Sequence, residues 1–262
     1  MLRKYSTSRT LSENIRLGIL TAFSAGMVNV AALIIFFSFA SNVTGHYAIL
    51  AAEIAKGNWY QALVVFLWIF MFFFGSFSSN FIVINYNKVS PYIAHATPIV
   101  MEIICLMAVG IYGQFFYRET LVETEALLAL MLFAMGLQNG LTASISNGAV
   151  KTTHLTGATT DLGILASMLL RSEYRRNEEM VGKAKLISLI ALFYVAGAVI
   201  SGFVYFRIGF QLFYLVSAFL VVVIFYDAYE IRFRKFLAHE HNKRKRSVFA
   251  VSAASNTEDS ES

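Results

Sequence analysis

Two short polar stretches interrupt an otherwise apolar sequence, and each contains a Thr-Gly pair. The first is SNVTGHYAIL, with Thr44 and Gly45, and the second is KTTHLTGATTDLG, with Thr156 and Gly157. A threonine hydroxyl can cap a helix and a glycine tolerates a tight turn, so each pair predicts a helix start with free backbone N–H groups. Because a helix start carries partial positive charge, two of them facing one another would bind an anionic or strongly polar group.

An asparagine lies in the apolar segment before each Thr-Gly pair, Asn29 in the first case and Asn139 in the second. Asn139 follows Asn29 by 110 residues and Gly157 follows Gly45 by 112 residues, which predicts two copies of one unit. An amide without a hydrogen-bond partner inside a membrane costs several kcal/mol. Each asparagine therefore either joins two helices or lines a cavity shared by the two copies, and the matched positions favour the cavity.

Ionisable side chains accompany both turns. His46 follows the first Thr-Gly pair, His154 precedes the second, and Asp161 falls about one turn inside the helix that the second pair begins. Asp161 can stabilise the helix dipole, bind a cation or carry a coupling proton. The two histidines are either structural side chains or members of a proton or cation relay.

A further carboxyl, Glu102, lies about half-way along an apolar segment, on the same helical face as His95 and Pro98. It either pairs with a neighbouring polar side chain or takes part in coupling. The predicted coupling residues are Asp161, His154 and Glu102. The predicted substrate-binding residues are Asn29, Thr44, Gly45, His46, Gln138, Asn139, Thr153, His154, Thr156, Gly157 and Asp161.

The composition indicates a membrane protein. Of the 262 residues, 57% are hydrophobic and 14% are charged, whereas soluble domains carry about 25% charged residues. The single cysteine, Cys105, can form neither an internal disulfide nor a multi-cysteine metal site, and the common hydrolase, nucleotide and zinc motifs do not occur. We therefore expect no enzyme activity, no cofactor and no metal site. The net charge of +5 is explained by orientation in the bilayer rather than by nucleic acid.

The expected fold is an all-α membrane protein of six transmembrane helices, arranged as two inverted-topology repeats of three helices. The segments after the Thr-Gly pairs, ending near residues 55 and 170, are shorter than the roughly 20 residues that cross a bilayer, so we predict re-entrant or half-membrane helices there. If both crossed fully, there would be eight spans in parallel repeats. The six predicted spans are at about 17–40, 61–84, 92–116, 126–148, 185–206 and 209–229.

An orientation with both termini in the cytoplasm accounts for the basic residues. Of the 21 Lys and Arg residues, only Lys56, Arg118 and Arg207 then lie outside, as the positive-inside rule requires. The basic run in the C-terminal tail either docks on anionic lipid or acts as a topology signal. The predicted parts are a cytoplasmic tail at 1–16, a first repeat at 17–117, an extracytoplasmic connector at 118–125, a second repeat at 126–230, and a basic, then disordered cytoplasmic tail at 231–262.

Four sequences in this order, SAGMVNVAAL, SNVTGH, GLQNGL and KTTHLTGATTDLG, resemble the YoaK family of bacterial multi-pass membrane proteins, a family of unknown function. The resemblance covers about residues 15 to 230. It implies an integral protein of the inner membrane and a transporter. Members often carry asparagine where this chain has His46.

These observations favour a secondary transporter of a small polar or charged solute, with proton coupling as one form of it. A channel is the nearest alternative, and a non-transporting scaffold or accessory protein that works through the basic tail is a different one. The expected partners are the solute and the lipid bilayer, with a homo-oligomer left open and nucleic acid excluded. The expected location is the inner (plasma) membrane.

Overall fold

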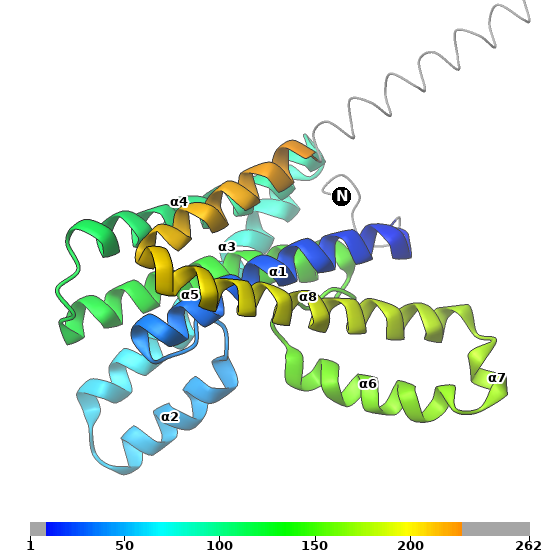
Figure 1. Cartoon of the computed structure of the whole chain (residues 1–262), viewed down its shortest axis with the longest axis horizontal. Coiled ribbons are helices and arrows are strands. Elements are labelled where there is room, and N and C mark those ends of the chain that lie inside the picture. The colour runs from blue at the N-terminus through cyan, green and yellow to red at the C-terminus, as the bar shows by residue number, and fades with distance from the viewer. Residues whose placement is uncertain (1–8, 227–262) are drawn as a thin grey trace, which may run out of the picture. The chain divides into compact units, whose positions relative to one another are not determined.

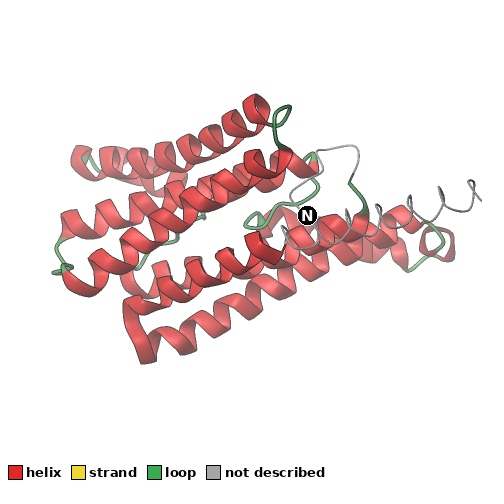
Figure 2. Ribbon diagram, turned by 90° about the horizontal axis from the view of Figure 1, so that it is seen from above, coloured by secondary structure: helices red, strands yellow, loops and turns green. Residues whose placement is uncertain are grey.

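A computed structural model describes residues 9–226 of the chain, and in this range it contains helices and loops but no strand (Figures 1 and 2). The tail predicted at 231–262 and the first eight residues of the tail at 1–16 lie outside the described residues. The helices are α1 (Leu11–Phe36), α2 (Val43–Ala55), α3 (Trp59–Tyr86), α4 (Pro91–Phe115), α5 (Leu121–Ser146), α6 (Leu155–Leu169), α7 (Ser172–Arg175) and α8 (Glu178–Ile208), followed by the 3-10 turn η2 (Gly209–Gln211) and helical residues 212–226.

Five stretches of the described chain are long and apolar enough to cross a membrane, which confirms the all-helical, multi-span prediction. They are α1, α3, α4, α5 and the stretch Glu178–Tyr226. The last of them contains η2, where Gly209 has a φ of 57° and the chain changes direction (Figure 1). The count of six spans treats the helices on either side of η2 as separate, and it stays a prediction.

The helices α1 and α5 begin and end in the same way. The Thr10 side chain accepts a hydrogen bond from the backbone N–H of Glu13, and the Thr120 side chain accepts one from that of Glu123. Each glutamate side chain accepts a hydrogen bond from the backbone N–H of its threonine, so both helices start with a capping box. Both have 26 residues and are followed by a left-handed residue. The capping box explains why α5 starts at Leu121, before the expected residue 126: the second half of the acidic connector is the first turn of the helix.

Two close helix crossings hold the bundle together. Two Gly-x-x-x-Ser sequences, beginning at Gly75 in α3 and Gly197 in α8, predict such contacts, because small residues let helices approach. A Cβ added to Gly197 would collide with the carbonyl oxygen of Phe23 in α1, and one added to Gly75 would collide with that of Phe133 in α5. The pairs α1 with α8 and α3 with α5 therefore form equivalent contacts, and each of them joins the first half of the chain to the second.

Candidate functional site

The segments that follow α1 and α5 run back into the described bundle before the next helix starts. Loops normally lie on the surface, yet Ala40, Ser41, Val150 and Thr152 in these two segments are all buried. Figure 1 shows that α2 and α6 then start near the middle of the bundle and run outward, α2 beside α3 and α6 beside α8. Buried connections of this kind bring two helix starts close together.

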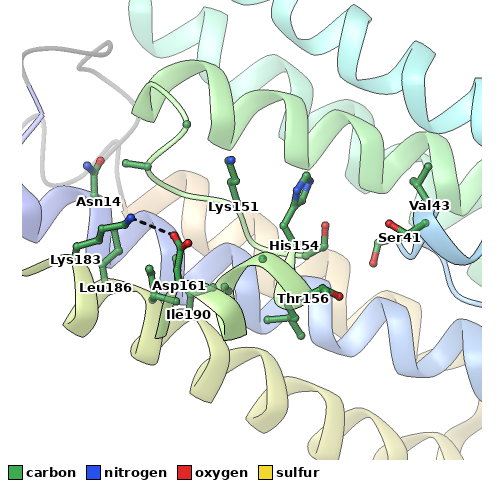
Figure 3. Close-up of a pocket in the computed structure, with 18 of the residues that line it drawn as sticks. Asn14, Ser41, Val43, Lys151, His154, Thr156, Asp161, Lys183, Leu186 and Ile190 are labelled. Atoms are coloured by element: carbon green, nitrogen blue, oxygen red, sulfur yellow. Dashed lines mark ion pairs between the residues drawn. The ribbon is translucent and has the colours of Figure 1, made fainter. Parts of the chain in front are cut away.

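A cavity of about 1010 Å³ is lined by both helix starts (Figure 3). Residues 41–44, at the start of α2, form one part of its wall, and residues 153–158, at the start of α6, form another. The first turns of α1 and of α8 also contribute to it. Six of the predicted site residues line this one cavity: Thr44, Thr153, His154, Thr156, Gly157 and Asp161.

The asparagines hold the buried segments that lead to the cavity. The Asn29 side-chain oxygen accepts a hydrogen bond from the Ser41 hydroxyl at 3.0 Å, and the Asn139 oxygen accepts one from the Thr153 hydroxyl at 2.9 Å. Ser41 and Thr153 line the cavity, whereas neither asparagine is among the lining residues. The Asn29 amide nitrogen also donates to the Tyr194 hydroxyl at 2.5 Å, which ties the first segment to α8. Each asparagine thus positions one wall of the cavity.

The expected role of the threonines at the helix starts is wrong. The N-cap of α2 is Asn42, whose side chain accepts the Gly45 N–H, and the N-cap of α6 is His154, which makes no side-chain capping bond. Thr44 and Thr156 are instead the second residues of their helices. Gly45 and Gly157 are helical and have no positive φ, so no tight turn explains them. Each helix starts two residues earlier than a threonine N-cap requires.

His46 and Gln138 anchor helices and do not line the cavity. The His46 ring is 2% exposed, its Nε2 lies 2.9 Å from the Phe39 carbonyl oxygen, and the ring packs edge-on against Trp68. The Gln138 amide nitrogen donates to the Ser24 hydroxyl at 2.7 Å, which joins α5 to α1. His46 therefore has the structural role that was one of its two alternatives, and Gln138, predicted to bind substrate, joins two helices instead.

Glu102 lies apart from the cavity lining. It is fully buried within α4, and within residues 9–226 neither carboxyl oxygen has a hydrogen-bond partner. His154 and Asp161, the other two predicted coupling residues, do line the cavity. Partial burial lowers the pKa of His154, and the nearby Lys151 lowers it further, so its imidazole is neutral at pH 7.

Two lysines in the cavity were counted in the sequence only as topology signals. The Lys183 Nζ forms an ion pair with the Asp161 carboxylate at 3.1 Å, joining α8 to α6 (Figure 3). Lys151 lines the cavity beside His154. A lysine in a loop or at the start of a span carries no sequence signal that separates a binding role from a topological one. Residues 147–154 run inward, and this course brings Lys151 into the cavity that Lys183 also lines.

These features define an integral membrane protein built from helices, with two short helices that start at a common polar cavity. Residues 17–226 match the family model described as Protein of unknown function (DUF1275), and the chain belongs to this family. Comparison with curated proteins and with solved structures gives no significant match. The resemblance to a family of unknown function is thereby confirmed, and the name YoaK remains a resemblance.

Proposed function

We propose that this protein is a secondary transporter of a small polar or charged solute, and that the cavity between the starts of α2 and α6 is its binding site. One observation carries the proposal: two segments about 110 residues apart, each tied to an asparagine of the preceding span, line the same cavity. Interrupted helices whose N-terminal ends meet near the bilayer midplane are the arrangement that many secondary transporters use for their substrates.

The proposed architecture has six spans in two inverted repeats, with α2 and α6 re-entrant. With 13 and 15 residues, α2 and α6 are about 20 and 22 Å long, shorter than the roughly 30 Å of a bilayer core. The equivalent capping boxes of α1 and α5 and the equivalent glycine crossings support a repeat. Three spans per repeat then require the second copy to enter from the opposite side. The termini are cytoplasmic and the membrane is the inner one in this proposal.

Transport by the purified protein in liposomes tests the proposal. Pools of labelled amino acids, carboxylates, sugars and inorganic ions are offered with and without an imposed pH gradient. We expect accumulation of one class against its own gradient, and His154 and Asp161 make a proton gradient the first driving force to try. Flux that only dissipates a gradient would identify a channel instead. Absence of flux for every pool and driving force would favour the scaffold.

A matched pair of variants links transport to the cavity. Thr156 lines it, whereas Thr159, on the same helix, is not among the lining residues and its hydroxyl bonds the Leu155 carbonyl at 2.8 Å. We expect Thr156→Val to reduce transport and Thr159→Val to leave it near the wild-type rate. Equal effects of both substitutions would place the binding site elsewhere.

A further inference from the structure

An ion pair crosses from one re-entrant helix to the neighbouring long helix inside the cavity. Asp161 belongs to α6 and Lys183 to α8, and their side chains are 46% and 56% exposed. Because both charges remain accessible, a dissolved ion that enters the cavity can reach either of them. Water screens a pair of this kind, so its attraction is modest and a competing ion can replace one member.

The other charged groups around the pair include one lysine, Lys151, that no carboxylate neutralises in the part of the chain that the structure describes. The basic side chains of the cavity, as far as the structure describes the chain, are Arg9, Lys151 and Lys183, and its carboxylates are Asp161 and Glu179. Arg9 is engaged by α1, since it donates to the Asn14 side-chain oxygen at 2.7 Å and to the Glu13 carbonyl at 3.1 Å. Lys151, by contrast, forms no ion pair with any carboxylate in the described range.

The start of α6 adds further donors to this side of the cavity. Its N-cap, His154, makes no capping bond, so the first-turn N–H groups lack the side-chain acceptor that Asn42 supplies in α2. His154 itself is neutral and adds no charge at pH 7. Uncapped N–H groups, Lys151 and Lys183 all favour a negatively charged ligand.

We infer that the transported solute is a small anion, and that Asp161 acts as an internal counter-ion which occupies Lys183 while the site is empty. The anion binds by replacing the Asp161 carboxylate at the Lys183 Nζ, and Lys151 and the start of α6 add positive potential elsewhere in the same cavity. Since a carboxylate and a small anion offer the same kind of acceptor oxygens, the exchange leaves Lys183 paired in both states. This inference rests on the proposed transport function and specifies its substrate class.

The inference reverses the expected effect of removing the Asp161 charge. If Asp161 bound a cation, Asp161→Asn would weaken binding of that cation, and if it carried the coupling proton, the substitution would remove the pH dependence of transport. If it competes with the solute for Lys183, the same substitution removes the competitor and strengthens anion binding. The expected gain is about two- to five-fold, the equilibrium factor of an exposed ion pair. Lys183→Met removes the principal cation and lowers affinity, whereas Lys183→Arg retains it.

Anion binding is measured on the full chain in nanodiscs, as the rise of the thermal unfolding temperature with concentration of phosphate, sulfate, nitrate or acetate at constant ionic strength. We expect at least one anion to give a saturable rise, a lower half-saturation concentration in Asp161→Asn, and loss of the rise in Lys183→Met. Lys185→Met is the matched control, because Lys185 is on the same helix and does not line the cavity. Size-exclusion profiles establish that each variant is folded.

Three results would overturn the inference: no saturable rise with any of the four anions, weaker or unchanged binding in Asp161→Asn, or equal losses in Lys183→Met and Lys185→Met. The liposome experiment separates this failure from failure of the proposed function. Accumulation of a cation or a neutral solute would refute the anion and leave the transporter intact. Saturable anion binding without any flux would refute the transporter and leave the anion site.

Discussion

Replacing Asn139 with alanine should both destabilise the protein and loosen one wall of the cavity. The Asn139 oxygen accepts hydrogen bonds from Thr153 at 2.9 Å and from Thr152 at 3.4 Å, and the Thr152 side chain is fully buried. A membrane hydrogen bond contributes about 0.6 kcal/mol on average, and a buried hydroxyl left without a partner costs about 1–3 kcal/mol. We therefore expect Asn139→Ala to lower the free energy of unfolding by about 2–3 kcal/mol.

Equilibrium unfolding in mixed detergent micelles measures this loss, and a double-mutant cycle with Thr153→Val isolates the pairwise bond. The expected coupling energy is about 0.6–1.5 kcal/mol. Asn85→Ala serves as control, because Asn85 lies in an exposed position of α3 and bonds only its own helix, at the Phe81 carbonyl. A loss below about 0.5 kcal/mol for Asn139→Ala, the usual range of a surface substitution, would refute the assigned role.

Four further predictions concern topology, packing, pH and dynamics. Impermeant thiol reagents should label Arg118→Cys in intact cells and Arg175→Cys only after permeabilisation; the reverse pattern would invert the proposed orientation. Gly197→Val should prevent accumulation of folded protein because its Cβ meets backbone, while Gly202→Val, where a Cβ meets nothing within 4 Å, should be tolerated. His154→Asn should reduce the loss of thermal stability below pH 6.5. Burial lowers the pKa of His154 in the folded state, so this histidine stabilises the wild type above its unfolded-state pKa, and that stabilisation is lost as the pH falls. Identical pH profiles would exclude His154 as the source. Amide hydrogen exchange should be faster in α6 than in α2, and equal rates would show that the two helices are held equally well.

The sequence was sufficient to predict the all-helical, multi-span fold, because it displays the apolar runs directly. Of the eleven predicted binding residues, six line one cavity, and their role in binding stays a prediction. Apolar runs determine the spans, and the repeated spacing of Asn29 and Asn139 indicated equivalent places in two units. The capping roles at the two Thr-Gly pairs could not be predicted, since they depend on a difference of two residues in the helix start, which the sequence pattern does not determine. The role of Lys183 was also hidden, because the ion pair depends on how α6 lies against α8 and the sequence pattern does not specify this.

The two short helices α2 and α6 are attached by different kinds of interaction. Each buries only one side chain, His46 in α2 and Leu165 in α6. The His46 ring packs against Trp68, and the Trp68 indole N–H donates to the Glu125 carbonyl at 3.0 Å, so α2 is held by buried contacts that reach α3 and α5. The polar attachment of α6 is instead the half-exposed pair with Lys183, which a dissolved ion can exchange. If a solute takes the place of Asp161 as we propose, the ion-pair restraint on α6 is lost while the attachment of α2 is unchanged, so we expect solute binding to change the position of α6 and not that of α2.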